Sequence, residues 1–130
     1  MAEGVCKEIQ VQCECNYQPD SDYQQGNCPF VSLIDGAGNV KDGKGGVAIL
    51  NLDGSMKNVN WITGLNAPKG LAIYKNTLYI ADLTAVVSVD IPSGKIINKL
   101  EIAGAVFLND ITVDNKGVLY VSDTRTNKIH

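Results

Sequence analysis

The chain has 130 residues, with 14 acidic and 11 basic side chains, so its net charge at neutral pH is −3. Its lysines and arginines are scattered, which argues against a nucleic-acid partner. No apolar run reaches the roughly 18 residues that a membrane-spanning helix needs. The length favours a single domain.

A Cys-rich N-terminal segment, residues 1–29, holds all four cysteines. Their spacing favours two disulfides of open pairing, and hence an oxidising compartment, periplasmic or secreted, after removal of an export signal. A zinc site is disfavoured because no Cys-x-x-Cys pair is present. Four reduced thiols, as in a cytoplasmic protein, are the remaining alternative. The cysteines are Cys6, Cys13, Cys15 and Cys28.

Residues 30–62 form the first β-rich unit. Residues 30–35 are predicted to be the third strand of an incomplete sheet, and a Gly-rich loop, residues 36–46, follows. Residues 38–45 nearly match a phosphate-binding loop. However, Gly45 stands where a hydroxyl should hold Mg²⁺, and an apolar strand follows instead of a helix, so nucleotide binding is not expected.

The rest of this unit is predicted to be a hairpin. Residues 47–52 and 57–62 are its strands, and Asp53-Gly54 is its turn. Trp61 is the sole tryptophan. We expect its ring to pack between neighbouring sheets; the alternative is a platform on which a ligand stacks.

The next two units, about residues 63–104 and residues 105–130, repeat one another. Tyr79 corresponds to Tyr120 and Gly70 to Asp110, and the single extra residue of the later copy falls at a turn, where insertions are tolerated. The matching segments are short, rich in β-branched and aromatic residues and bounded by turn signals. Strand-type segments that recur with a period of about 40 residues predict an all-β fold of β-propeller blades, each with four antiparallel strands.

The sequence accounts for about three blades: a partial first, a complete central and a partial third. Closed propellers typically have about four to eight. We therefore expect either that the natural chain continues past His130 or that copies assemble to close the ring. Open blade edges would favour such self-association.

Within the repeat, recurring and differing positions have different meanings. An aspartate recurs at the end of a strand, as Asp82 and Asp123, and is expected to accept backbone N–H bonds there. At the start of the innermost strand the central copy has Lys69-Gly70, whereas the next copy has Asn109-Asp110. An amide and a carboxylate are hard oxygen ligands for Ca²⁺ or Mg²⁺; the alternative is an Asx-turn.

At these residues the chain resembles the six-bladed propeller family of gluconolactonase, senescence-marker protein and luciferin-regenerating enzyme. It is also similar to NHL-repeat propellers. The matching text lies in residues 67–73 with 78–82, and in residues 108–114 with 117–123. The resemblance implies hydrolysis of a lactone or related ester at a divalent cation, usually Ca²⁺. It implies that Asn109 and Asp110 are cation ligands and that Asn109 also contacts substrate.

The chain departs from that family pattern in two ways. No match to its first-blade glutamate is found, and the other ligand-bearing blades would lie beyond residue 130. The polypeptide is therefore expected to be inactive alone. The alternative function is a non-catalytic NHL-type module that binds a protein ligand or serves as a scaffold. Ser–His or Cys–His catalysis is poorly supported, because His130 is the only histidine.

Overall fold

The computed structural model describes residues 8–10 and 30–130. The four cysteines, and the disulfides predicted for them, lie outside these residues. Every regular element in the described part is a β-strand, which confirms the all-β prediction. Among these residues no helix could cross a membrane.

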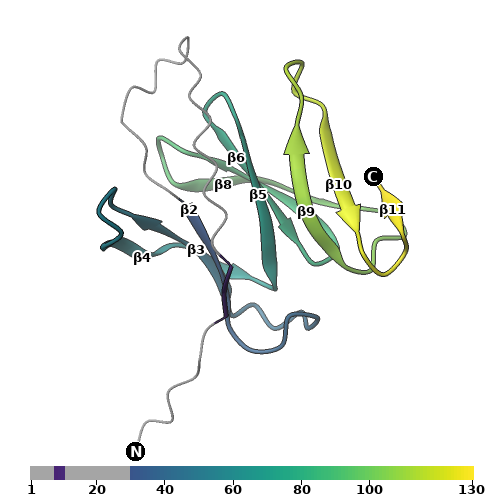
Figure 1. Cartoon of the computed structure of the whole chain (residues 1–130), viewed down its shortest axis with the longest axis horizontal. Coiled ribbons are helices and arrows are strands. Elements are labelled where there is room, and N and C mark those ends of the chain that lie inside the picture. Colours follow the sequence, from purple (N-terminus) through teal and green to yellow (C-terminus); the bar gives the residue numbers. More distant parts are fainter. Residues whose placement is uncertain (1–7, 11–29) are drawn as a thin grey trace, which may run out of the picture.

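The strands form three antiparallel sheets that stand side by side (Figure 1). The first sheet contains β1 (Glu8–Gln10), β2 (Phe30–Ile34), β3 (Gly45–Leu50) and β4 (Met56–Leu65). The second contains β5 (Pro68–Tyr74), β6 (Thr77–Asp82), β7 (Ala85–Asp90) and β8 (Lys95–Glu101). The third contains β9 (Leu108–Val113), β10 (Leu119–Asp123) and β11 (Lys128–Ile129). In each sheet, strands that follow one another in the chain are neighbours.

The sequence repeat becomes a structural repeat. Ala72 pairs with Tyr79 across β5 and β6, and Thr112 pairs with Tyr120 at the same place across β9 and β10. The extra residue of the later copy lies in the hairpin turn, where the third sheet uses Gly117 at a φ of 85°. Glycine reaches this left-handed conformation without the cost that a side chain brings.

The predicted place of residues 30–35 in the first sheet is wrong. Strand β2 is second in its sheet, not third, because only β3 and β4 follow it before the second sheet begins. It pairs on its other side with the short strand β1, with Ile9 opposite Leu33. So short a strand leaves no alternation in the sequence that could have revealed it.

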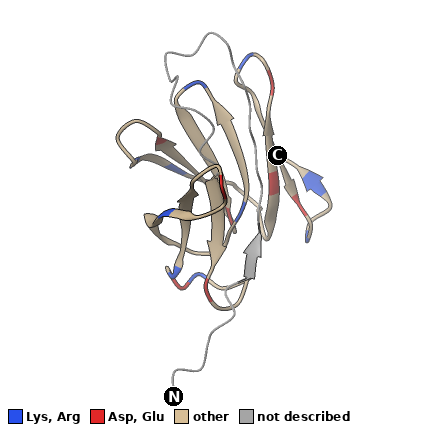
Figure 2. Cartoon of the chain, turned by 60° about the vertical axis from the view of Figure 1, so that its left-hand side comes forward, with Lys and Arg blue, Asp and Glu red and all other residues tan. Residues whose placement is uncertain are grey.

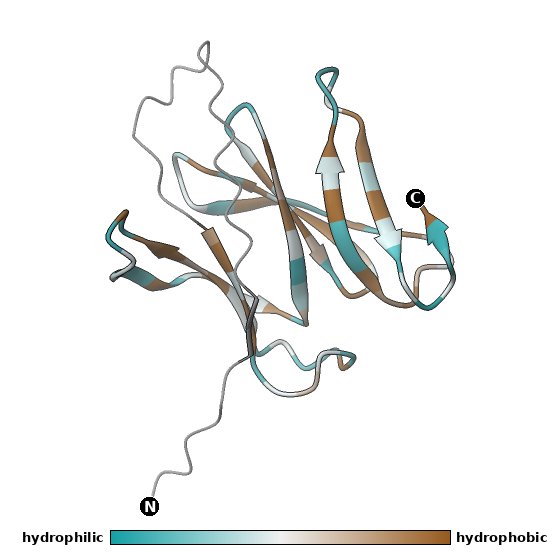
Figure 3. Cartoon of the chain, viewed as in Figure 1, coloured by the Kyte–Doolittle hydropathy of each residue, from teal (hydrophilic) through white to brown (hydrophobic). Residues whose placement is uncertain are grey.

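Strands β5, β6 and β7 of the second sheet are largely buried on both faces, whereas its outermost strand β8 is exposed. Alternate residues of a strand point to opposite sides, so each buried strand contributes to two cores. Leu71 packs toward the first sheet, whereas Ala72 packs toward the third. Figure 3 shows hydrophobic residues alternating with more hydrophilic ones along β9 and β10 of the third sheet. The core between the first two sheets contains Phe30, Val47, Ile62, Leu65, Leu71, Leu78, Ile80, Val87, Val89 and Ile91. The core between the second and third contains Ala72, Ala81, Val86, Leu108, Ile111 and Val121.

Trp61 packs between the first two sheets, as predicted. Its ring centroid lies 4.9 Å from that of Phe30 in the first sheet. On the other side it meets Gly94, in the turn between β7 and β8, where a Cβ would lie 2.9 Å from the indole Nε1. Glycine at position 94 therefore lets the turn of one sheet approach the indole of the next.

Candidate functional site

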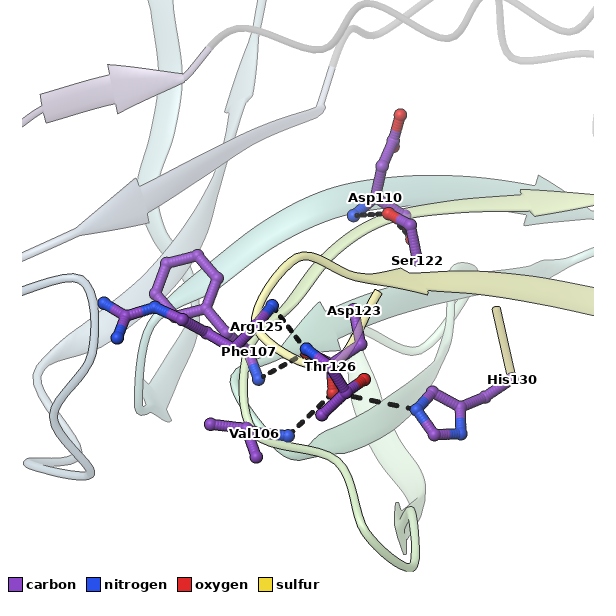
Figure 4. Close-up of polar contacts among 8 residues, drawn as sticks. All are labelled: Val106, Phe107, Asp110, Ser122, Asp123, Arg125, Thr126 and His130. Atoms are coloured by element: carbon purple, nitrogen blue, oxygen red, sulfur yellow. Dashed lines mark hydrogen bonds and ion pairs between the residues drawn. The ribbon is translucent and has the colours of Figure 1, made fainter. Parts of the chain in front are cut away.

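Two buried aspartates fasten the segments that lead into the inner strands. Asp82, at the end of β6, accepts the N–H of Asn66 at 2.9 Å and that of Ala67 at 2.7 Å. Asp123, at the end of β10, accepts the N–H of Val106 at 2.7 Å and that of Phe107 at 3.1 Å (Figure 4). The donors occupy corresponding positions of the two repeat units. The predicted capping role of both carboxylates is confirmed.

Asp123 also organises the loop that follows it. Its Oδ1 accepts the N–H of Arg125 at 3.0 Å and that of Thr126 at 3.2 Å. Burial alone would raise the pKa of this carboxyl, but four backbone N–H groups favour the ionised form and lower its pKa to about 2. The ionised carboxylate is thus part of the folded structure.

Acidification tests this role. Because the folded pKa is below the ordinary value of about 3.9, Asp123 stabilises the native state above about pH 4 and loses that contribution as the pH falls toward 2. Asp123→Asn should unfold more easily at neutral pH and lose less stability between about pH 4 and 2. Urea unfolding at a series of pH values measures both; parallel curves for the two proteins would contradict the assignment.

His130 lies beside Asp123, an arrangement that sequence reasoning missed. Its Nε2 is 3.7 Å from Asp123 Oδ2, so the two form an ion pair when the imidazole is protonated (Figure 4). His130 also exchanges two backbone hydrogen bonds with Val121 in β10. The pairing of β10 with β11 brings His130 next to Asp123. No sequence motif links this histidine to an aspartate, so the contact could not be predicted. The Asp123 carboxylate already accepts four backbone N–H groups. We therefore interpret its contact with His130 as part of the fold and not as a catalytic pair.

The structure places the predicted cation ligands at the start of β9. Asn109 is half-buried and Asp110 is exposed. The Asp110 backbone N–H donates to Ser122 Oγ in β10 at 3.1 Å (Figure 4). Asp110 Oδ1 accepts the N–H of Ile111 at 2.8 Å. Asp110 therefore takes part in a local turn-like hydrogen bond, while its carboxylate stays on the surface of an ordered strand.

Strand β5 of the second sheet lies directly against this position. A Cβ on Gly70 would be 2.6 Å from Asp110 Cα and 2.8 Å from Asp110 Oδ1. These distances are too short for a real side chain, so only glycine at position 70 leaves room for Asp110. Residues 70 and 110 correspond in the repeat, and the fold brings them into contact.

Lys69, the counterpart of Asn109, is buried and has a structural role. Its Nζ donates to Gly38 O at 2.8 Å and to Ala67 O at 3.0 Å, and lies 4.2 Å from the centroid of the Phe107 ring. Burial lowers the pKa of Lys69, and the nearby Asp82 charge opposes that effect. The ammonium joins the Gly-rich loop, the second sheet and the third sheet.

The donor set fits part of a divalent-cation site. Carboxylate and amide oxygens suit Ca²⁺, which takes about six to eight oxygen ligands. Within the described residues no group of three or more His, Cys, Asp or Glu side chains is arranged to hold a metal. Charged residues are distributed over the sheets and loops (Figure 2). Asn109 and Asp110 can therefore supply a share of a coordination sphere.

The Gly-rich loop between β2 and β3 has no phosphate-binding architecture. Lys44 N–H donates to Asp42 Oδ1 at 3.0 Å, and strand β3 begins at the next residue. A phosphate site of this type needs a helix N-terminus at that point. The expectation that nucleotide does not bind here remains a prediction, supported by this local structure.

No protein-family model and no curated protein sequence matches the chain. Among solved structures it is similar to a gluconolactonase from Xanthomonas campestris, with a TM-score of 0.54 and 16% identity over 75% of this chain and 38% of that one. The fold is that of β-propeller blades. A hydrazine synthase from Kuenenia stuttgartiensis has a TM-score of 0.47 and 15% identity over 95% of this chain and 40% of that one. The chain thus spans well under half the length of either protein.

Proposed function

We propose that these propeller blades belong to a hydrolase that opens a lactone or related ester at a divalent cation, Ca²⁺ by preference. The observation that supports this most is the position of Asn109 and Asp110 at the start of an inner strand, with Gly70 of the neighbouring blade leaving room for the carboxylate. The fold likeness to a gluconolactonase is consistent with it.

In this proposal Asn109 and Asp110 hold the cation, and the Asn109 amide also orients the substrate. A bound cation would polarise the ester carbonyl and lower the pKa of an attacking water. The chain's own contribution is rigidity. The Asp110 backbone is fixed to Ser122 in β10, and β9 is held against β5 at Gly70. A site built on such ordered strands keeps its ligands in place.

The remaining ligands would come from further blades or from a second copy. The chain covers 38% of the gluconolactonase to which it is similar, and two side chains cannot complete a Ca²⁺ sphere. We therefore expect the polypeptide to bind Ca²⁺ weakly and to lack lactonase activity. We expect the longest available form of the parent protein to bind Ca²⁺ and to hydrolyse lactones.

Calorimetric titration with Ca²⁺ tests the site. Asn109→Ala should leave the melting temperature of the metal-free protein nearly unchanged but remove the heat of Ca²⁺ binding and any stabilisation by Ca²⁺. The matched control is Asn115→Ala, which truncates an exposed asparagine in the turn at the other end of the same hairpin. No binding to the longest parent chain, or an equal loss in both variants, would exclude the metal site.

A non-catalytic NHL-type propeller that binds a partner is the second candidate. It is favoured by Lys69, whose cationic side chain occupies the position of Asn109 in the neighbouring blade and is bound to carbonyl groups. A cation site shared between these blades would instead need an oxygen ligand at position 69. Lactonase assays on the longest parent chain, with Ca²⁺ and with chelator, distinguish the two: Ca²⁺-dependent turnover supports the hydrolase, and its absence supports the scaffold.

A further inference from the structure

The third blade differs from the second at four positions around the start of β9. Arg125 belongs to this set because the end of β10 pairs with the start of β9, with Asp123 opposite Leu108. The proposed cation site uses an amide and a carboxylate of the set, and leaves an aromatic ring and a guanidinium group without a role. The four residues are Phe107, Asn109, Asp110 and Arg125, which stand in place of Ala67, Lys69, Gly70 and Thr84.

Arg125 is the only arginine of the chain, and its guanidinium group lies over the ring of Phe107. The Arg125 Cζ is 5.5 Å from the ring centroid, a distance at which a cation and an aromatic face attract each other. Figure 4 shows the two side chains alongside each other. The Arg125 backbone is fixed by its N–H bond to Asp123 Oδ1. The side chain is thus restrained at its base and at its tip.

The Arg125 guanidinium group forms no ion pair with an acidic side chain in the part of the chain that the structure describes. The Asp123 carboxylate next to its backbone already accepts four backbone N–H groups. Lys69 adds positive charge, because its Nζ lies 4.2 Å from the centroid of the same Phe107 ring. A stacked guanidinium group presents its N–H donors in a fixed plane that matches the two oxygens of a carboxylate. The arrangement therefore suits a carboxylate of a ligand.

This guanidinium group lies near the proposed cation ligands. One residue separates Phe107 from Asn109, so the Cα atoms of these two residues are at most about 7 Å apart. The exposed Asp110 carboxylate repels a second negative charge, and a cation held at Asp110 would offset that repulsion. A small ligand could therefore place its carboxylate at Arg125 and its ester group at the cation.

We propose that Arg125, supported by Phe107, is a subsite for the carboxylate of a small organic ligand. The rest of the ligand follows from the proposed function, on which this part of the inference rests: the substrate is a lactone or ester that also carries a free carboxylate group. Arg125 orients this substrate and takes no part in breaking its ester bond. A neutral lactone such as gluconolactone leaves the subsite empty.

Because Arg125 is the only arginine, its single Nε–Hε signal in a proton–nitrogen correlation spectrum reports on this subsite. Glucarate, a sugar acid with a carboxylate at each end, should shift that signal saturably in mildly acidic, metal-free buffer. Glucitol, which has the same carbon chain without carboxylates, should not shift it. Sulfate at the same ionic strength should bind several-fold more weakly. Metal is removed with a resin, because a dissolved chelator is itself a carboxylate.

The amide signals of Phe107 and of position 125 give the Kd of glucarate for each variant. Arg125→Gln should weaken binding roughly tenfold or more, because a charge-assisted pair is lost. Arg125→Lys keeps the charge without the planar fork and should also lose most of the affinity. The matched control is Lys116→Gln, which removes an exposed charge at the other end of the same hairpin and should bind like the wild type. Circular dichroism checks that each variant is folded.

No saturable shift with glucarate, an equal response to sulfate, or wild-type affinity in either Arg125 variant would overturn the carboxylate subsite. These measurements need neither Ca²⁺ nor turnover, so they succeed or fail separately from the calorimetric test of Asn109. In the longest parent chain, Arg125→Gln should lower kcat/KM roughly tenfold more for a lactone of glucarate than for gluconolactone. An equal loss for the two lactones would contradict the proposed substrate class.

Discussion

Replacing Asp82 by alanine is expected to lower the free energy of unfolding by about 3 kcal/mol or more. The carboxylate is fully buried and accepts the N–H groups of Asn66 and Ala67, which precede β5. Truncation leaves these donors without an acceptor in the interior, and each such group costs about 1–3 kcal/mol. It also removes the negative charge that favours the buried ammonium of Lys69.

Chemical denaturation of Asp82→Ala and two reference variants measures this effect. Asp82→Asn keeps the size and one acceptor oxygen and should lose less stability. Asp53→Ala is the matched control, because Asp53 makes comparable bonds to Ser55 in an exposed turn, where water replaces a lost partner. A similar loss for Asp82→Ala and Asp53→Ala would show that Asp82 does not fasten the inner strand.

Adding one methyl group at Gly70 is expected to destabilise the protein by about 2–4 kcal/mol. The new Cβ would lie 2.6 Å from Asp110 Cα and 2.7 Å from Ile111 N. These are backbone atoms of β9, so no side-chain rotation can relieve the clash, and the second and third blades must move apart. Gly70 is not among the residues with positive φ, so the cost comes from this contact and not from backbone strain.

The matched control is Gly38→Ala, because a Cβ at position 38 would meet nothing within 4 Å. Its stability should be close to that of the wild type. Hydrogen exchange locates the damage: in Gly70→Ala the amides of β9 and β10 should exchange faster than those of β2 and β3. Uniform acceleration throughout the chain, or wild-type stability, would contradict the contact between β5 and β9.

Much of the fold is readable from the sequence because the repeat preserves alternation. Leu71, Leu78 and Ile80 have aliphatic counterparts at the matching positions of the next repeat unit, and a strand must bury such a row on one face. The recurring aspartates were readable for the same reason. The short strand β1 was not, since its position is determined by pairing with β2 and by no pattern of its own.

The candidate site was only partly readable. The difference between Lys69-Gly70 and Asn109-Asp110 marked the inner strands, but the contact between Gly70 and Asp110 depends on how two sheets pack. The partnership of His130 with Asp123 depends on where the chain turns back after β10. The proposed cation site could not be read from one segment, because Ca²⁺ takes about six to eight oxygen ligands and Asn109 and Asp110 offer only two side chains.

The two repeat copies stand side by side as blades, with β5 against β9, and the candidate site depends on this contact. It can be measured in the wild-type chain by nuclear Overhauser spectroscopy on isotopically labelled protein. The structure predicts a strong cross-peak between a Gly70 α-proton and the Ile111 amide proton, because the Cβ direction of Gly70 points to within 2.7 Å of that nitrogen. Gly70 cross-peaks to β6 alone, with none to β9, would contradict the blade arrangement and the cation site proposed on it.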